Sequence, residues 1–491
     1  MGRRGLRLIV LAALPALVLS ACNSPAPTPT PTATPTAPKA TPSQASAAPS
    51  ATISPATIRW FVGLDLGTET AQVDAEKAFV ASYNSVNKDG ITIKLEIVPT
   101  ATAADVLKSE MAAGNSPDIV GPLGVGDFNG FEGLFLDLTS QMKKNSFDVT
   151  PYDPALVKFW QLGDQGQIGL PYTIFPGYLW YNKDLFAKAG LPDLPTRVGD
   201  QYQGQTWDWT ELGKVAAQLT VDKSGRKATD AGFDPKSIAR YGLDFQWTDL
   251  RRLVSCFGSG SFVSPDGKKA QVPAVWADAL SWYYNGIWGK SLFIPSGLAE
   301  SSALLAQGNA QSSGAVAMNV GWATSIPSIA TDAKSAKVKN WNIGVMPSWQ
   351  GTTTSPMYGD TFAITRASKY PDAAFKAMVA IMADQTLLRN YGAEPARTAD
   401  QQAYFASFDQ ALTPIFPDIS VTWSVLGEME KVPAIPSFEA NLPNLAQAQA
   451  DYSSLLARLE AKPGLDVVAE LTKLQAKLQA DFDAAQPLVS P

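Results

Sequence analysis

The sequence predicts an α/β protein with a parallel sheet, more than one lobe, and helices at its C-terminal end. Strand-helix-strand alternation begins near Thr57, which is typical of a parallel sheet. The chain has 491 residues and so exceeds an ordinary domain of about 100–200 residues. The pattern after residue 445 is entirely helical. These three observations together favour two α/β lobes over one.

Composition excludes several classes of function. Hydrophobic residues make up 45% of the chain, which is enough to fill a sizeable core. The chain has no histidine and only two cysteines, so it cannot form a Ser-His-Asp or Cys-His nucleophile, a His-ligated zinc site or an all-thiolate zinc site. The net charge of −6, without a basic run, argues against a nucleic-acid partner. An enzyme would therefore need carboxylates, Lys, Tyr or a bound cofactor. From the family resemblance given below we expect no cofactor, no metal and no enzymatic activity.

The first 22 residues have the pattern of a secreted lipoprotein. Three arginines within the first seven residues precede an apolar stretch from 8 to 19, which is too short to span a bilayer. The stretch ends in Leu19-Ser20-Ala21-Cys22, which resembles the bacterial lipobox. We predict a signal peptide at 1–21 and lipidation of Cys22, hence an extracytoplasmic protein anchored to the cell membrane. The alternative is a plain signal peptide with an incidental cysteine.

Residues 22–56 are predicted to be a tether. After Cys22 they are almost entirely Pro, Thr, Ala and Ser, a composition with little to bury and a bias towards extended polyproline II structure. If Cys22 is lipidated, Cys256 is the remaining thiol and no intramolecular disulfide can form. Whether the threonines are glycosylated is left open.

The folded body begins with a strand-helix-strand unit. Residues 58–62 form a continuous apolar strand, residues 69–87 carry apolar side chains at helical spacing, and residues 91–97 alternate apolar and polar side chains. A second unit follows, with a helix around 103–113 and a strand entered at 117–120. Strand-helix-strand units of this kind predict that their strands pair in parallel.

Later segments continue the alternation and then become helical. Two strands are expected at 314–320 and 362–364. Helices are expected at 207–219, 275–288, 371–382, 445–459 and 467–482. In the last helix Val467, Leu471, Leu474, Leu478 and Phe482 recur every three or four residues, which indicates an amphipathic surface helix.

Two glycine-containing segments resemble phosphate loops but lack their context. Residues 63–68 resemble the first phosphate loop of the actin and sugar-kinase superfamily, yet a helical pattern follows where that superfamily has a second strand. Residues 121–126 follow a strand, but their glycines are not in the G-x-G-x-x-G order. We interpret the first segment as a strand-to-helix turn and the second as a crevice loop.

The tryptophans divide into two groups. Those at 276, 282 and 288 share one helix and are interpreted as packing residues. Trp60, Trp322 and Trp423 are placed at strand ends or in loops, where an indole can stack on the apolar face of a sugar ring.

An ordered set of short motifs resembles the extracellular solute-binding proteins of ABC importers, specifically family 1, the maltose-binding-protein-like sugar-binding lipoproteins. The resemblance covers about residues 57–485. The motifs in the first half of the chain are Ala112-Ala113-Gly114-Asn115-Ser116-Pro117-Asp118, Gly133-Leu134-Phe135-Leu136-Asp137-Leu138, Gly169-Leu170-Pro171, Tyr181-Asn182-Lys183-Asp184-Leu185-Phe186, Ala189-Gly190-Leu191 and Thr206-Trp207-Asp208-Trp209. Those in the second half are Gly314-Ala315-Val316-Ala317-Met318, Gly344-Val345-Met346-Pro347, Tyr358-Gly359-Asp360-Thr361-Phe362 and Glu394-Pro395-Ala396-Arg397. Trp209 stands where the family usually has an acid, and residues 197–201 look like an insertion.

This resemblance implies a two-lobed periplasmic-binding-protein-like fold with a hinge and C-terminal helices. One lobe would comprise residues 57–172 and 357–392, and the other residues 173–356 and 393–491. The first crossover would lie at 171–178. The implied function is high-affinity binding of a mono- or oligosaccharide and its delivery to the transmembrane permease subunits, by a protein that we expect to be a monomer.

The resemblance also implies ligand-binding residues at the lobe boundary. By position these are Asp65, Asp127, Tyr172, Trp322, Tyr358, Asp360, Arg397 and Trp423. A secreted carbohydrate-active enzyme and a surface adhesin lipoprotein remain alternatives. Another polyol, a glycerol phosphate or a peptide remain alternative ligands.

Overall fold

The computed structural model describes residues 55–131, 133–162, 165–246, 248–290, 292–301, 310–323, 338–414 and 416–485. The predicted signal peptide, Cys22 and nearly all of the predicted tether lie outside these residues.

The first elements form the predicted parallel unit. They are β1 (Ala56–Val62), α1 (Thr70–Val86), β2 (Ile91–Ile97), α2 (Thr100–Ala112) and β3 (Ile119–Gly124). Strand β1 lies between β2 and β3 and pairs in parallel with both, which confirms the predicted pairing. The crevice loop predicted at 121–126 is wrong. Strand β3 runs through Gly124 because Leu123 and Gly124 pair with β13, and α3 (Val125–Phe128) follows at once.

The remaining strands extend this sheet in the order β2-β1-β3-β13-β4-β9-β8-β7, with β10 and β14 also paired to β4. They are β4 (Thr173–Asn182), β7 (Val221–Asp222), β8 (Ile238–Asp244), β9 (Val316–Trp322), β10 (Trp341–Gly344), β13 (Met357–Ile364) and β14 (Glu394–Pro395). Two small hairpins lie apart from it, namely β5 (Gln201–Tyr202) with β6 (Gln205–Thr206) and β11 (Ser348–Trp349) with β12 (Thr352–Thr353).

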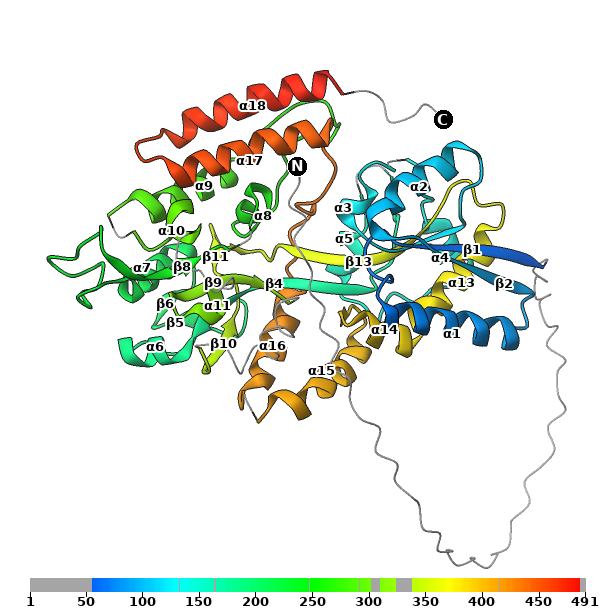
Figure 1. Cartoon of the computed structure of the whole chain (residues 1–491), viewed down its shortest axis with the longest axis horizontal. Coiled ribbons are helices and arrows are strands. Elements are labelled where there is room, and N and C mark those ends of the chain that lie inside the picture. The colour runs from blue at the N-terminus through cyan, green and yellow to red at the C-terminus, as the bar shows by residue number, and fades with distance from the viewer. Residues whose placement is uncertain are drawn as a thin grey trace, which may run out of the picture. The chain divides into compact units, whose positions relative to one another are not determined.

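Strand β4 joins two hydrophobic cores. Its first half pairs with β13 and contributes Ile174 to the core that contains Phe61, Val120 and Phe135. Its second half pairs with β9 and β10 and contributes a run of four residues, Tyr178 to Tyr181, to the other core. The protein therefore has the predicted two-lobed α/β fold, in which β4 and β13 run side by side between the lobes (Figure 1). The lobe boundaries predicted at 172/173 and 356/357 fall where these two strands begin.

Helices cover both lobes, and two long helices end the described chain. The shorter ones are α4 (Thr139–Lys144), α5 (Pro154–Phe159), α6 (Lys183–Ala189), α8 (Leu250–Ser255), α10 (Gly297–Ser301), α11 (Ala310–Ser313) and α14 (Gln385–Tyr391). The longer ones are α7 (Trp209–Leu219), α9 (Ala274–Trp288), α13 (Pro371–Ala383), α15 (Thr398–Leu412), α16 (Ile419–Met429), α17 (Leu445–Ala461) and α18 (Val467–Asp483). No helix in the described ranges is long and apolar enough to cross a membrane.

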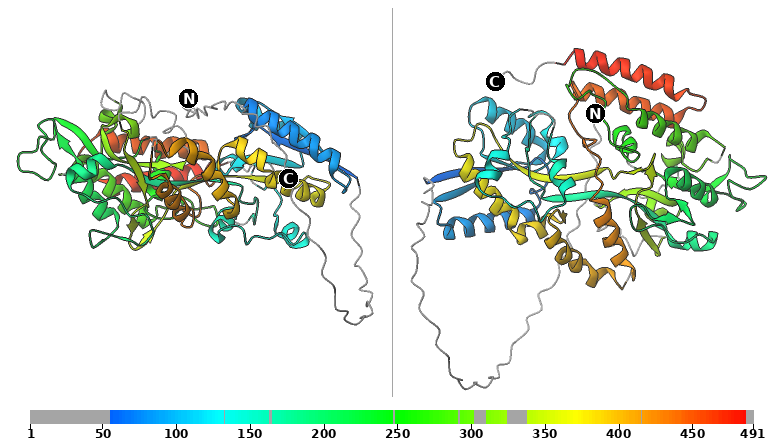
Figure 2. Two further views of the ribbon diagram at one scale, coloured as in Figure 1. Left: turned by 90° about the horizontal axis from the view of Figure 1, so that it is seen from below. Right: turned by 180° about the vertical axis from the view of Figure 1, so that it is seen from behind.

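The C-terminal helices pack as their apolar spacing predicts. All five residues of the predicted stripe on α18 are buried. Helices α17 and α18 lie alongside each other in both views of Figure 2. The tryptophans of α9 belong to or pack against the same core, which confirms that they are packing residues.

The segment between α16 and α17 contacts both lobes, although both helices belong to the core that contains Tyr178. Residue Ser355 pairs with Pro433, and Ile435 packs against the core that contains Phe61. Further on, the carbonyl oxygen of Glu439 accepts a hydrogen bond from the Asn129 side chain of the first lobe (2.7 Å). The next residue, Ala440, accepts one from the Arg251 guanidinium of the second (2.5 Å). Residues 432–440 therefore contact both lobes.

The packing of α7 on β8 requires glycine at 242. A Cβ atom at this position would lie 2.0 Å from the backbone oxygen of Ala216, and no side-chain rotation can relieve a clash with backbone. We expect Gly242→Ala to lower the free energy of unfolding in urea by about 1–3 kcal/mol. The control is Gly427→Ala in α16, where no atom lies within 4 Å. That variant should gain up to about 1 kcal/mol from helix propensity. Equal stability of the Gly242→Ala variant and the parent would contradict this account.

Candidate ligand-binding site

An aromatic group surrounds Arg252 at the boundary between the lobes. The guanidinium carbon of Arg252, on α8, lies 4.2 Å from the centre of the Trp322 ring at the end of β9. The same group lies 5.7 Å from the Tyr358 ring on β13, and its Nη1 donates a hydrogen bond to the Tyr358 hydroxyl (2.5 Å). The ring of Phe438 meets Tyr358 edge-on at 5.0 Å. A cation held over aromatic faces in this way is stabilised by the ring quadrupole.

Local structure explains how these side chains meet. Asp249 caps α8 by accepting a hydrogen bond from the backbone N–H of Arg252 (3.0 Å), which fixes where the helix begins. Trp322 pairs with Gly177 at the point where β4 passes between the cores. Tyr358 pairs with Phe175 on the same strand. Strand β4 thus positions both aromatic residues from its two sides.

An acidic group adjoins the aromatic one. Asp127 accepts a hydrogen bond from the Gly124 N–H (2.8 Å) at the start of α3. A Cβ atom at Gly124 would lie 3.5 Å from a carboxylate oxygen of Asp127, 3.7 Å from one of Asp65 and 3.5 Å from the Gly359 carbonyl oxygen. A Cβ atom at Gly126 would lie 3.2 Å from a carboxylate oxygen of Glu439. Three carboxylates therefore lie around one short glycine-containing segment.

The two groups are neighbours because they share chain segments. Gly359, beside the acidic group, follows Tyr358 in β13. Glu439, also in the acidic group, follows Phe438 in the segment between α16 and α17. The structure thus brings four of the predicted ligand residues, Asp65, Asp127, Trp322 and Tyr358, to one region, with an arginine and an aromatic ring added.

Two more predicted ligand residues, Asp360 and Tyr172, are buried next to this region. Asp360 accepts a hydrogen bond from the Thr173 hydroxyl (2.9 Å), and its backbone oxygen accepts one from the Tyr172 N–H (3.2 Å). The Tyr172 ring packs edge-on against Phe362 and Tyr391 and is only 3% exposed. These side chains join β4 to β13, and Tyr172 faces packed side chains.

Arg397 and Trp423 lie in other surroundings. Arg397 precedes α15 and forms an ion pair with Asp400 at 3.5 Å. Trp423 lies within α16 and not in a loop as the sequence suggested. Its ring stacks on Phe405 at 4.7 Å, and its indole N–H donates to Asp409 (2.8 Å). These contacts join α15 to α16.

Trp60 is also a packing residue, and its interpretation as a sugar-stacking residue is wrong. It lies inside β1 with no exposed surface, and its indole N–H donates to the Gly121 carbonyl oxygen (2.8 Å). The position at a strand end did not reveal that the last three residues of β1, from Trp60 to Val62, are all buried.

No pattern in the sequence pointed to Arg252, Phe438 or Glu439. Arg252 follows Arg251 in a short helix with an ordinary aspartate cap, a pattern typical of an exposed turn of helix. Phe438 and Glu439 lie in the segment between α16 and α17, which has no regular periodicity. Their proximity to Tyr358 and Gly126 depends entirely on the tertiary fold.

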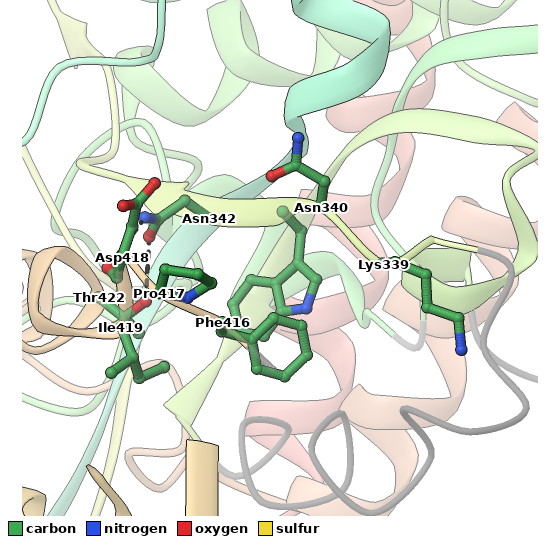
Figure 3. A pocket seen from close by; sticks show the side chains of 9 residues that line it. Lys339, Asn340, Asn342, Phe416, Pro417, Asp418, Ile419 and Thr422 are labelled. Carbon is green, nitrogen blue, oxygen red and sulfur yellow. Dashed lines mark hydrogen bonds between the residues drawn. The ribbon is translucent and has the colours of Figure 1, made fainter. Parts of the chain in front are cut away.

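A separate cavity of about 230 Å³ lies between β10 and the start of α16. It is lined by Lys339, Asn340, Trp341, Asn342, Phe416, Pro417, Asp418, Ile419 and Thr422. Figure 3 shows Asn342, Asp418 and Thr422 on one side of it and Lys339 on the other. The Asn342 side chain bonds to Thr422 (3.0 Å), and Asp418 pairs with Lys183 (2.5 Å). Because these polar groups are already engaged and none is a predicted ligand residue, we do not assign the ligand site here.

Several carboxyl groups are buried in the lobes. Burial raises the pKa of Glu76 to about 8, although the hydrogen bond from the Tyr391 hydroxyl (2.9 Å) lowers it. Burial also raises the pKa of Glu300 and of Glu430 to about 7. No cluster of three or more Cys, Asp and Glu side chains within the described ranges is arranged to hold a metal ion.

Fold and site together define a class, the two-lobed α/β proteins in which strands cross between lobes beside a group of aromatic and carboxylate side chains. The model of the bacterial extracellular solute-binding protein family matches residues 66–386, and the chain belongs to that family. This confirms the resemblance found in the sequence motifs.

Solved structures share the fold at low sequence identity. M. tuberculosis UspC has a TM-score of 0.65 and 22% identity, covering 87% of this chain and 100% of that protein. A sugar transporter protein from Rhizobium etli in an open conformation has a TM-score of 0.63 and 18% identity, covering 88% of this chain and 100% of that one. The sugar-binding protein MalE from Xanthomonas citri has a TM-score of 0.63 and 16% identity, covering 87% of this chain and 98% of that one.

A sequence relative is known from Brucella abortus. A binding protein of strain 2308 is 29% identical over 204 residues, which are 40% of this chain and 44% of that protein. The match thus spans less than half of the length of this relative.

The raised pKa of the buried Glu76 carboxyl should make the stability of the folded protein depend on pH. The folded protein holds the Glu76 proton more tightly than the unfolded chain, whose carboxyl titrates near its ordinary pKa of 4.5. Stability contributed by the protonated form is therefore lost as the pH rises from about 4.5 to about 8.

We expect Glu76→Gln to lose less stability than the parent between pH 5 and pH 9, since the amide does not ionise. The difference should reach a few kcal/mol in urea unfolding, and other buried carboxyls will leave a residual slope. Asp74→Asn, at an exposed position on the same helix, controls for loss of a charge. An unchanged slope in Glu76→Gln would refute this account.

Proposed function

We propose that this protein is the extracytoplasmic substrate-binding component of an ABC importer, and that its ligand is a mono- or oligosaccharide. The observation that carries the proposal is the meeting of Trp322 and Tyr358 with the carboxylates of Asp65 and Asp127 where the strands cross between the lobes. Family membership and the sugar-binding description of the X. citri neighbour support it.

The chemistry of this region suits a polyhydroxylated ligand. An aromatic ring packs on the C–H face of a sugar, and carboxylates accept hydrogen bonds from its hydroxyl groups. Asp65 follows strand β1, and Asp127 lies on α3 directly after strand β3, which is parallel to β1. Ligands of open α/β sheets bind at the carboxyl ends of strands. The role is binding and not catalysis.

Closure of the lobes is the proposed mechanism. We propose lobes made of residues 57–172 with 357–392 and of residues 173–356 with 393–491. The ligand would select the closed arrangement by contacting both lobes, and the closed protein would then dock on the permease. The groups that would bind the ligand come from both lobes. Trp322 belongs to the core that contains Tyr178, and Asp127 lies on α3 of the other lobe.

Location and assembly follow from the N-terminal pattern. We propose cleavage after residue 21, lipidation of Cys22 and a flexible tether that holds a monomeric body outside the cell membrane. The tether would let the body reach the permease while diffusing with the lipid anchor.

Thermal stabilisation by sugars tests the ligand class. At 100 times Kd a ligand that binds only the folded protein raises stability by about 2.7 kcal/mol. We expect at least one member of a panel of mono- and oligosaccharides to raise the melting temperature, with Kd in the micromolar range or below. If none stabilises the protein, the carbohydrate assignment fails.

A matched pair of variants locates the site. Trp322→Leu should weaken binding of the stabilising sugar roughly tenfold, as one aromatic contact contributes about 0.5–1.5 kcal/mol. Trp423→Leu also removes an indole, but one packed between α15 and α16, and should change stability while leaving affinity unchanged. Equal loss of affinity in both variants would argue that neither indole marks the site.

The two cysteines form a second matched pair. In cells that process lipoproteins, Cys22→Ser should move the protein from the detergent phase to the aqueous phase in Triton X-114 partitioning. Cys256→Ser removes a buried thiol and should leave partitioning unchanged. Detergent-phase partitioning of the Cys22→Ser variant would contradict the lipid anchor.

A further inference from the structure

The guanidinium of Arg252 lacks a counter-ion among the described residues. Within the described ranges it forms no ion pair with a carboxylate, and its Nε is buried without a hydrogen-bond acceptor. Its guanidinium stacks on Trp322, lies farther from the Tyr358 ring, and donates a hydrogen bond to the Tyr358 hydroxyl. A buried or half-buried charge is normally paired, so this arrangement is unusual.

A second donor lies beside it. The indole N–H of Trp322 is also buried without an acceptor in the described part of the chain, and this side chain is only 6% exposed. Because the guanidinium stacks directly on the indole, the two unsatisfied donors belong to side chains in contact. A buried donor without an acceptor costs free energy of folding. The Arg252 and Trp322 donors therefore need a hydrogen-bond acceptor.

A carboxylate would supply both the counter-ion for Arg252 and the acceptor for the two donors. An ionised carboxylate only accepts hydrogen bonds and can take two at once from a guanidinium and a neighbouring N–H. A neutral sugar hydroxyl would leave the positive charge uncompensated. The missing partner is therefore an anion.

The adjoining acidic group restricts which anion fits. Asp65, Asp127 and Glu439 gather around Gly124 and Gly126, next to the segments that carry Tyr358 and Phe438. A doubly charged phosphate would be repelled by these carboxylates more strongly than a singly charged carboxylate. The same acids accept hydrogen bonds from hydroxyl groups on the rest of the ligand.

We propose that the ligand is an acidic saccharide, with its carboxylate on Arg252 and its hydroxyl groups towards Asp65 and Asp127. This inference rests on the proposed function, which it narrows from sugars in general to uronic acids and oligosaccharides that contain them. Arg252 is then the specificity-determining residue.

The test compares uronic acids with their methyl esters, which keep the shape and lose the charge. Calorimetric titration would use galacturonate, glucuronate and their short oligomers, the corresponding methyl esters, the neutral parent sugars and sugar 6-phosphates. We expect at least one acid to bind the parent protein roughly 10- to 100-fold more tightly than its ester, as for a charge-assisted hydrogen bond.

Variants assign this preference to the guanidinium. Arg252→Gln should bind acid and ester equally, and Arg252→Lys, which keeps the charge without the planar fork, should retain part of the preference. Arg397→Gln removes an arginine outside the group and should keep the full preference. Melting curves of each variant show that it folds.

Three results would overturn the inference. The first is equal or tighter binding of the neutral sugars or esters by the parent protein. The second is tighter binding of neutral sugars by Arg252→Gln, which would make Arg252 a plug on the Trp322 face. The third is a preference for sugar phosphates. In each of these cases the proposed saccharide-binding function stands. If no probe binds, both that function and the preference for acidic saccharides are wrong.

Discussion

The pairing of β13 with β4 is the constraint on which the rest of the structure depends. Backbone hydrogen bonds along Met357–Asp360 and Thr173–Pro176 hold together the two strands that pass between the cores. On one side β13 pairs antiparallel with β3 of the parallel unit, and on the other β4 pairs antiparallel with β9. Both cores are therefore organised around a few residues of ladder, and the aromatic and acidic groups lie where that ladder ends. Rotation of one lobe against the other must be absorbed in this short stretch and between α14 and α15, where the chain also passes from one lobe to the other. Residues 432–440, which contact both lobes, must adjust with it.

Most of the fold followed from local pattern in the sequence. The alternation of β2, the helical stripe of α18 and the glycine and proline at the ends of elements are all short-range signals. The order of motifs then supplied the two-lobed topology. Strand β3 was predicted too short because its last residues, including Gly121 and Gly124, do not favour strands by composition. They form a strand because β13 pairs with them, and that partner lies more than 200 residues away.

The site was predicted only in part, and for a related reason. Asp65 and Asp127 follow parallel strands, and residues in that position gather at one edge of a sheet. Trp322 and Tyr358 were found through motifs. Tyr172 lies just before β4 and Trp423 lies within a helix, and sequence could not tell which way their rings point. Arg252 lies 106 residues from Tyr358 along the chain, and Phe438 lies 80 residues from it, so no local pattern could have joined them.

The residues that surround Tyr358 and Gly359 are distinct from those that hold the sheet together. The strand that carries them is fixed by backbone pairing, which is indifferent to most side chains. Arg252 and Phe438 come instead from a six-residue helix and an irregular segment, neither of which is part of the sheet. Selection acting on gene duplicates can exchange these side chains without disturbing the ladder or either core. Transporters with new cargo can arise in this way from one scaffold by changes at very few codons.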